Sequence, residues 1–172
     1  MTGEIDIRPL VDADAAALLD LLRLVAGVAG AGLARQPDEF SADYAAAVVR
    51  RAAAGVALGA FADGMLVGAI HCARMEPRQF AHVLTDLTVA VSPRAQGAGV
   101  GSRLFADLFA RVEREMPGIR RLELVCRSGN EAAIRLYARL GFVAEGRFAD
   151  RVVLPDGRVE DDIAMAKFFR RG

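Results

Sequence analysis

Residues 94–101 read Arg-Ala-Gln-Gly-Ala-Gly-Val-Gly, so that three glycines alternate with small residues. They lie between an apolar run at 81–91 and an amphipathic segment at 100–112. This order predicts a strand, a glycine-rich loop and the start of a helix. Such a loop leaves backbone N–H groups unpaired beside the positive end of a helix dipole. The segment therefore predicts a phosphate-binding loop, and it restricts the chain to folds in which a helix follows that strand.

Length and composition narrow the class of protein. The 172 residues are 53% hydrophobic and 26% charged, which predicts one globular domain over residues 1–172. The 22 basic and 22 acidic side chains give a formal net charge of zero, which argues against nucleic acid as the main partner. No uncharged apolar stretch is 18 residues long, so no membrane span is expected.

The cysteines and the N-terminal residues indicate the compartment. Cys72 and Cys126 each lie in an apolar run, which favours two buried thiols over a disulfide. The N-terminal residues carry no basic region followed by a long apolar run, so no signal peptide is expected. His71 and Cys72 are adjacent in a strand and point to opposite faces, and no second ligand pair has usable spacing, so no metal site is expected. A cytoplasmic enzyme or binding protein fits these features.

Periodicity and turn residues predict a mixed α/β chain. The predicted strands are 4–8, 56–62, 65–73, 81–91, 121–126, 142–153 and 159–168, and the predicted helices are one that begins at Asp12 or Asp14, 37–51, 100–115 and 130–140. Two-residue turns at Asp63-Gly64 and Asp156-Gly157 predict antiparallel hairpins, whereas strand–helix–strand crossovers predict parallel pairing. We expect one mixed sheet with helices on both faces, and a ligand where the strands ending near Val91 and Cys126 lie side by side.

The loop does not match the common nucleotide-binding motifs. A P-loop requires Gly-Lys-Ser/Thr, and this chain has Gly101-Ser102-Arg103. A dinucleotide fingerprint would require a third glycine at Ser102 and an acid at the end of the next strand, whereas Glu123 lies within that strand. A plain turn before a helix stays an alternative, although alternating glycines are costly unless the backbone needs them.

Two motifs, taken together and in order, resemble the Gcn5-related N-acetyltransferase (GNAT) superfamily. The first is Arg/Gln-x-x-Gly-x-Gly/Ala, which Arg94, Gly97 and Gly99 match. The second is Asn-x-x-Ala-x-x-x-Tyr-x-x-x-Gly-Phe, which is matched in register by Asn130, Ala133, Tyr137, Gly141 and Phe142. The predicted element order is similar to that of the family along the whole chain. The resemblance implies a mostly antiparallel sheet with a splayed parallel pair of strands, flanked by helices on both faces.

The resemblance also implies acetyl-coenzyme A as the acetyl donor. The loop N–H groups would hold its pyrophosphate, Val89 and Val91 would pair with its pantetheine arm along a strand edge, and a backbone N–H near Val89 would polarise the thioester carbonyl. The residues expected to bind the donor are Val89, Val91, Arg94, Gln96, Gly97, Ala98, Gly99, Val100, Gly101, Ser102, Asn130, Ala133 and Tyr137.

The acceptor amine needs a base, because an amine with a pKa of about 10.4 is roughly one part in a thousand neutral at pH 7. Asp86 interrupts an apolar strand, where a carboxylate is partly desolvated, and similar enzymes often carry Glu there. The shorter Asp favours a relay through water, and the alternative is an Asp on the solvent face. Glu123 is the rival base, with an ion pair to Arg121 or Arg151 as its alternative. His71 and His82 are further candidates, although a lone strand histidine is more often packed or on the surface.

Tyr137 is implied to protonate or hydrogen-bond the departing thiolate. A tyrosine has a pKa of about 10 and a thiol about 8.5, so we expect a hydrogen bond that strengthens as charge develops rather than full proton transfer. Its alternative is a core position on a helix face. Asn130 is expected to cap that helix, which is compatible with contact to the donor.

The resemblance implies an acetyl-CoA-dependent N-acetyltransferase that acts directly on a primary amine of a small molecule, such as an amino acid. The alternatives are a protein or peptide N-acetyltransferase and a non-catalytic acyl-CoA sensor. The acceptor is expected between the first two helices and the hairpin at Asp156-Gly157, where charge could come from Asp38, Glu39, Asp43 and Asp161. Subunit pairing is common in similar enzymes, so a homodimer is an expectation of the resemblance.

Overall fold

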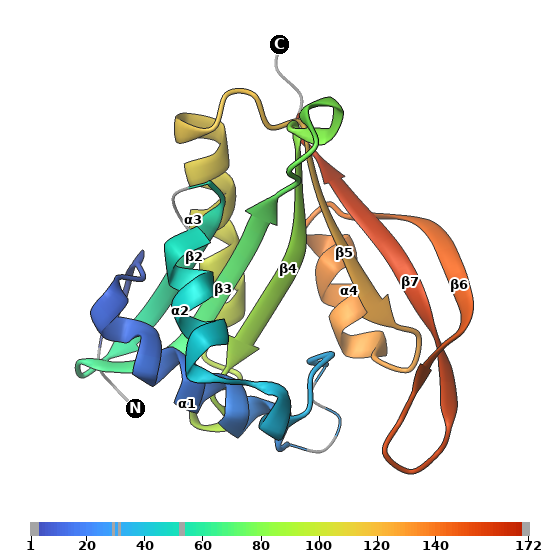
Figure 1. Cartoon of the computed structure of the whole chain (residues 1–172), viewed down its shortest axis with the longest axis horizontal. Helices are drawn as coiled ribbons and strands as arrows, with labels where there is room; N and C mark the ends of the chain where they lie inside the picture. Colours follow the sequence, from blue (N-terminus) through green and yellow to red (C-terminus); the bar gives the residue numbers. More distant parts are fainter. Residues whose placement is uncertain (1–3, 29, 31, 52–53, 170–172) are drawn as a thin grey trace.

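The computed structural model describes residues 4–28, 30, 32–51 and 54–169. Within these residues, seven strands form one sheet in the order β1-β2-β3-β4-β5-β7-β6 (Figure 1). The strands are β1 (Ile5–Pro9), β2 (Val56–Ala62), β3 (Met65–Arg74), β4 (Val83–Val91), β5 (Arg121–Arg127), β6 (Val143–Val153) and β7 (Val159–Phe168). The α-helices are α1 (Ala15–Ala26), α2 (Ala42–Arg51), α3 (Val100–Glu115) and α4 (Glu131–Arg139).

The sheet is antiparallel except at one pair of strands. β4 and β5 run parallel, and in the described residues their backbones pair at Val83 with Arg121 and at Leu84 with Leu122. Beyond Leu84 and Leu122 the two strands diverge, and β7 continues the sheet on the far side of β5 (Figure 1). The prediction of a mixed, mostly antiparallel sheet with one splayed parallel pair is therefore confirmed.

Helices cover both faces of the sheet, as predicted (Figure 1). One core lies under α3 and α4 and is centred on buried apolar residues of α3, such as Leu104, Phe105 and Leu108, which follow the 3.6-residue period of the helix. The other core lies under α1 and α2 and includes Leu18, Leu22 and the residues of α2 that face the sheet. The two cores hold the central strands from both sides, so that the edges of β4 and β5 are fixed where they separate.

The predicted helix 37–51 is wrong as a single element. A 3₁₀ turn, Pro37–Glu39, precedes Phe40, whose extended backbone (φ −89°, ψ 124°) breaks the helix. Phe40 is buried, and Arg23 Nη2 donates a hydrogen bond to its carbonyl at 2.7 Å. Ser41 then caps α2, because its Oγ accepts a hydrogen bond from the N–H of Tyr44 at 3.1 Å. The predicted strand 81–91 begins two residues later, at Val83, after a 3₁₀ turn at Arg78–Phe80.

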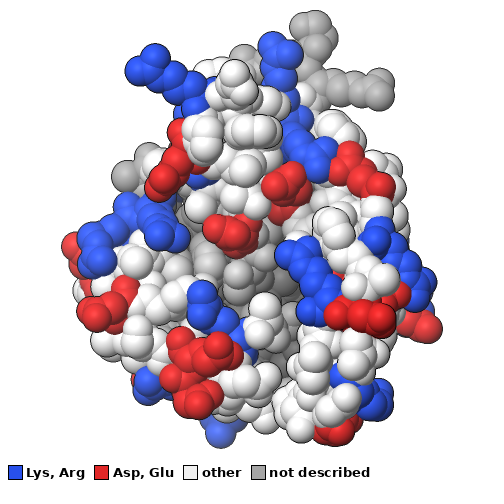
Figure 2. All heavy atoms as spheres, turned by 45° about the vertical axis from the view of Figure 1, so that its right-hand side comes forward, with Lys and Arg blue, Asp and Glu red and all other residues white. Residues whose placement is uncertain are grey.

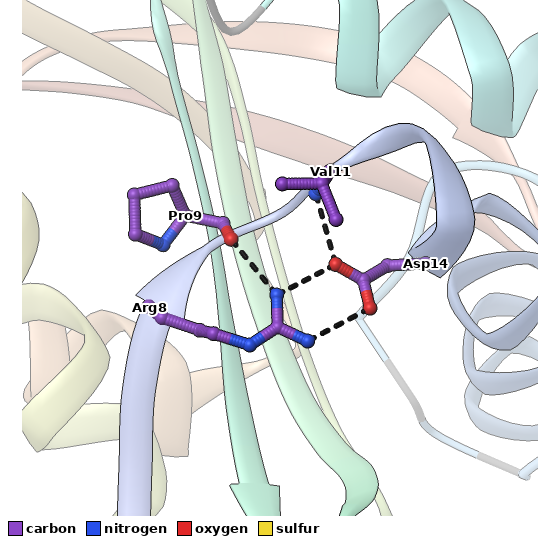
Figure 3. Close-up of polar contacts among 4 residues, drawn as sticks. All are labelled: Arg8, Pro9, Val11 and Asp14. Atoms are coloured by element: carbon purple, nitrogen blue, oxygen red, sulfur yellow. Dashed lines mark hydrogen bonds and ion pairs between the residues drawn. The ribbon is translucent and has the colours of Figure 1, made fainter.

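An ion pair fixes the turn between β1 and α1 (Figure 3). The guanidinium of Arg8 contacts both carboxylate oxygens of Asp14, at 2.7 and 2.9 Å, and Val11 N–H donates to Asp14 Oδ2 at 2.8 Å. Asp14 stands at the N-cap of α1 as predicted, but its carboxylate makes no capping bond to α1 and serves the preceding turn instead. The Arg8 guanidinium also lies 3.9 Å from the centre of the Phe61 ring, which ties the turn to β2.

Both cysteines, Cys72 and Cys126, are buried free thiols, as the sequence predicted. Burial raises the pKa of Cys72 to about 12 and that of Cys126 to about 11. Neither thiol therefore forms a reactive thiolate readily near neutral pH. None of the helices in the described part of the chain has the length and apolar character that a membrane crossing requires.

Candidate active site

The glycine-rich loop follows β4 through a 3₁₀ turn, Pro93–Ala95, and ends at the start of α3. Gly97 (φ +79°) and Gly99 (φ +74°) both have left-handed backbones, which explains the need for glycine at these positions. A Cβ added at either position would meet no atom within 4 Å. The surroundings of the two glycines are therefore open, and the backbone conformation rather than crowding by the protein requires them.

The first turn of α3 is open to a ligand. Gly99 is the N-cap of α3 and, having no side chain, provides no capping hydrogen bond. The buried residues Ala95 and Val100 anchor the two ends of the loop, while Gln96, Gly97 and Ala98 between them are exposed. Open N–H groups at the positive end of a 16-residue helix match the chemistry of a diphosphate. Phosphate binding by this loop stays a prediction.

The gap between β4 and β5 opens beyond Leu84 and Leu122, and the loop lies at the far end of β4. Val89 and Val91 of β4 pair with Ile70 and Gly68 of β3, so one edge of β4 is occupied there. On its other edge, no pairing with β5 extends beyond Leu84 in the described residues, and the edge is available to an extended ligand. Figure 2 shows this side of the molecule hollowed near its centre, with acidic and basic side chains around the hollow.

Asp86 lies at a distortion of β4 next to the gap. The pairing of β3 with β4 shifts register between His71 and Ala73, and Asp86 in the displaced stretch has a left-handed backbone (φ +54°). A β-bulge of this kind redirects a side chain, and such bulges are often found next to active sites. Asp86 is exposed, so the expected partial desolvation of its carboxylate is wrong. Its role as the base stays a prediction, with water within reach of the carboxylate.

Glu123 lies on β5 one residue beyond the last parallel pair, and it is engaged in an ion pair. Arg121 Nε donates to Glu123 Oε2 at 2.9 Å, and Arg121 Nη1 donates to Glu145 Oε1 of β6 at 2.8 Å. The sequence predicted this ion pair with Arg121 as the alternative to a role of Glu123 as the base. Of the two predicted bases, Asp86 is therefore the one whose carboxylate makes no ion pair within the described part of the chain.

Tyr137 projects from α4 into the core beneath the gap. Its ring packs at 71° to Phe105, with centroids 5.9 Å apart, and lies 5.7 Å from the ring of Phe142. Across the described residues, no hydrogen bond engages its hydroxyl. Burial, with a smaller contribution from Cys126, raises the pKa of Tyr137 to about 12. Proton transfer to a thiolate with a pKa of about 8.5 is then uphill by about 5 kcal/mol, which favours a donated hydrogen bond.

The second motif shapes the beginning and end of α4. Asn130 is the N-cap, and its Oδ1 accepts a hydrogen bond from Ala133 N–H at 3.2 Å. Gly141 ends the helix with φ +87°, and Phe142 after it is buried in the aromatic cluster. Gly32, in the segment between α1 and α2, lies so close to Asn130 that an added Cβ would come within 2.5 Å of Asn130 Nδ2. This segment thus reaches across to the start of α4.

The other polar residues predicted for the site are the two histidines and the acids of the expected acceptor site. His71 is buried, and its Nε2 is enclosed without a hydrogen-bond partner among the described residues. Burial, followed by the charge of Arg51, lowers the pKa of His71 to about 4. His82 is exposed at the start of β4. Among the predicted acceptor acids, Glu39 accepts a hydrogen bond from Gln36 N–H at 2.7 Å, and Asp161 pairs with Arg147. Both of these acids therefore support local structure.

The sequence reasoning missed a cavity beside Asp86. It has a volume of about 400 Å³ and is lined by the end of α2, the end of β3 and the distorted part of β4. Its charged side chains are Arg51, Arg74, Glu76 and Asp86. No motif could have identified it, because the charged residues come from three parts of the chain that meet only in the fold. The sequence signal that could have indicated a charged site is the arginine at the end of each element, Arg51 in α2 and Arg74 in β3.

Comparisons with known proteins place this fold and loop in one family. The family model described as "Acetyltransferase (GNAT) family" matches residues 22–142. This range contains the glycine loop, the splayed strands and α4. The chain therefore belongs to the GNAT acetyltransferase family.

Similar proteins with assigned names include two acetyltransferases. The chain is 36% identical over 110 residues to a phosphinothricin N-acetyltransferase of Alcaligenes faecalis, which covers 64% of this chain and 55% of that protein. It is 35% identical over 91 residues to a mycothiol acetyltransferase of Paenarthrobacter aurescens, which covers 52% of this chain and 27% of that protein. The chain thus aligns with about half or less of these relatives.

Solved structures agree on the fold. A GNAT-family acetyltransferase of Streptococcus pneumoniae superposes with a TM-score of 0.88 at 24% identity, covering 96% of this chain and all of that one. The protein yncA of Salmonella typhimurium, solved with acetyl-CoA, gives a TM-score of 0.85 at 22% identity and covers 98% of this chain and 96% of that one. At these identities the likeness concerns the fold.

Proposed function

We propose that the protein transfers an acetyl group from acetyl-CoA directly to a primary amine of a small molecule, such as an amino acid or a related amine. The observation that carries the proposal is the divergence of β4 and β5 beyond Leu84 and Leu122, next to an open helix N-terminus at Gly99. The free edge of β4 runs along the gap, and the predicted anion-binding loop lies at its open end. This arrangement suits a molecule with an extended arm and a diphosphate. Family membership supports the same donor.

The donor would lie along β4. The backbone groups of Gly97, Gly99, Val100 and Gly101 would bind the diphosphate, and the open edge at Val89 and Val91 would pair with the pantetheine arm. Gln96, Ala98, Ser102 and Arg94 would flank the diphosphate, and Asn130 and Ala133 would line the arm at the start of α4. The structure of yncA, which holds acetyl-CoA on a similar fold, supports this assignment.

The chemistry would use Asp86 and Tyr137. Asp86, through a water molecule, would take the proton of the acceptor ammonium, and the neutral nitrogen would attack the thioester carbon. The C–N bond forms and the C–S bond breaks, and the departing thiolate would accept a hydrogen bond from the Tyr137 hydroxyl. The acylated nitrogen would lose its second proton to water, and the thiolate would take a proton from water and leave as the free thiol of CoA. The raised pKa of Tyr137 supports stabilisation by hydrogen bonding over complete transfer of its proton. Direct attack requires no covalent intermediate, which is compatible with the burial of both cysteines.

A screen of acceptors tests the proposal. Purified protein is incubated with acetyl-CoA and, separately, with amino acids, polyamines, aminoglycosides and peptides, and the released thiol is measured. We expect thiol release with small amines and the corresponding N-acetyl product by mass spectrometry. Release with peptides alone would assign the protein to peptide acetylation, and binding of acetyl-CoA without release in any reaction would assign it to an acyl-CoA sensor.

A further inference from the structure

The cavity beside Asp86 carries both signs of charge in a small volume. Its lining includes the guanidinium groups of Arg51 and Arg74 and the carboxylates of Glu76 and Asp86. Within the described part of the chain, these four side chains form no ion pairs with one another or with other residues. A volume of about 400 Å³ lies within the range of small-molecule sites. The cavity can therefore accept a ligand that supplies the missing counter-charges.

Arg51 lines the same cavity as Thr85 and Asp86 in the distorted part of β4. It stands at the end of α2, and its charge helps to lower the pKa of His71, which lies on β3 opposite Thr88 of β4. The ring of His71 lies 6.4 Å from the ring of Tyr44, also on α2. The exposed side chain of Arg51 therefore lies at the end of α2, on the rim of the cavity that Asp86 also lines.

Arg74 lies between this cavity and a second one. The neighbouring cavity, of about 470 Å³, is lined by Arg74, Arg78, Arg120 and His82 and by no carboxylate. Arginines line both cavities, whereas carboxylates, those of Glu76 and Asp86, line only the first, and Asp86 is the one that lies on β4 next to the gap. A ligand with one charge of each sign would orient with its cation at Asp86 and its anion toward the arginines.

We infer that Arg51, together with Arg74, forms an anion subsite that selects acceptors bearing an acidic group close to the reacting amine. The acceptor class is a small zwitterion, in which a carboxylate or another oxyanion binds the guanidinium groups while the ammonium meets Asp86. Planar guanidinium groups bind such oxyanions through two parallel hydrogen bonds. This inference rests on the proposed function, since it concerns the acceptor of the same reaction.

The test compares each accepted amino acid with its amide, which keeps the amine and lacks the anion. We expect the wild-type protein to use the acid with a KM at least about 10-fold below that of the amide. Arg51→Gln should raise the KM of the acid about 10- to 100-fold and leave the KM values of the amide and of acetyl-CoA unchanged. Arg50→Gln is the matched control, because Arg50 is the preceding exposed residue of α2 and does not line the cavity.

Binding separates failure of the inference from failure of the proposed function. The amino acid is titrated by calorimetry into the protein saturated with CoA. Arg51→Gln or Arg74→Gln should weaken its binding, and Arg51→Lys should bind it more tightly than Arg51→Gln. If the protein acetylates the acid and the amide with equal KM, or if Arg51→Gln raises both KM values equally, the anion subsite is wrong, whereas the proposed acetyltransferase activity is retained. Binding that depends on Arg51 without any acetyl transfer would retain the subsite and overturn the proposed function.

Discussion

Leu84 of β4 lies opposite Leu122 of β5 as the second of two parallel backbone pairs, and the strands separate beyond them. Both side chains are fully buried, so the point of separation is held by the core under α3. One residue further on β5 is Glu123, and two residues further on β4 is Asp86. The candidate acid–base groups therefore lie at the closed end of the gap, and the glycine loop lies at its open end.

Substitution of Gly99 should reduce donor binding. Its φ of +74° is unfavourable for a residue with a Cβ by about 1–2 kcal/mol, so a side chain at this position should disturb the backbone that presents the N–H groups at the start of α3. We expect Gly99→Ala to weaken acetyl-CoA binding by about 10-fold or more, as measured by calorimetry.

Gly118→Ala is the control for this loop. Gly118 also has open space around an added Cβ, but it lies between α3 and β5 and has no left-handed backbone. Its affinity for acetyl-CoA should match that of the wild type. Equal affinity in the Gly99 variant would remove the loop from the donor site.

Removal of the Tyr137 hydroxyl should slow turnover and leave the fold intact. The ring contacts with Phe105 and Phe142 persist in Tyr137→Phe, and the hydroxyl has no hydrogen bond to lose within the described residues. We expect kcat to fall about 10- to 100-fold and the melting temperature to stay within about 2 °C of the wild-type value. An acetyl donor with a more acidic thiol should show a smaller loss, because its leaving group needs less stabilisation. Wild-type turnover would contradict the assigned role.

Asp86→Asn should lower kcat/KM. Asparagine tolerates a left-handed backbone, so the bulge should persist while the carboxylate is lost. We expect a loss of about 100-fold or more, measured by thiol release.

Asp63→Asn is the matched control, since Asp63 is another exposed aspartate with a left-handed backbone (φ +50°), in the turn between β2 and β3. It should retain wild-type activity. If Asp86→Asn retained wild-type activity and Glu123→Gln lost it, the base would be Glu123 despite its ion pair with Arg121.

The Arg8–Asp14 ion pair should stabilise the fold in a pH-dependent manner. The hydrogen bonds from Arg8 lower the pKa of Asp14, so its contribution is present above the unfolded pKa, near 3.9, and is lost as the pH falls through the lower folded value. Because Arg8 is partly exposed, we expect Asp14→Asn to lower the free energy of unfolding by about 1–2 kcal/mol at pH 7, measured with urea. The difference should shrink at about pH 2.5, and exposed Asp12→Asn should have little effect. An equal loss at both pH values would contradict this account.

Local sequence signals predicted the elements that turn residues and apolar periods define. The bounds of α3 (Val100–Glu115) and β7 (Val159–Phe168) matched the prediction, because Gly99 and Asp156-Gly157 mark where these elements begin. The break at Phe40 was missed, since it depends on burial of the Phe40 ring in the core and on the hydrogen bond from Arg23 to the Phe40 carbonyl.

Features of the site that depend on contacts between distant segments could not be read from the sequence. The left-handed backbone of Asp86 arises from the register shift between β3 and β4, and an aspartate in an apolar run does not reveal it. The ion pair of Glu123 with Arg121 is local and was one of the predicted alternatives, but the contact of Arg121 with Glu145 on β6, across β7, depends on the strand order. Local periodicity predicted the hairpin of β6 and β7 but not which of its strands lies next to β5.

The most direct test of the central claim is an NMR titration of the ¹⁵N-labelled protein with acetyl-CoA. The account predicts saturable binding with the largest amide shifts at Gly97, Gly99, Val100 and Gly101. The hairpin glycines Gly64 and Gly157, which have similar left-handed backbones, should serve as unshifted references. Saturation with the four loop amides unmoved, or no binding at millimolar acetyl-CoA, would contradict the account.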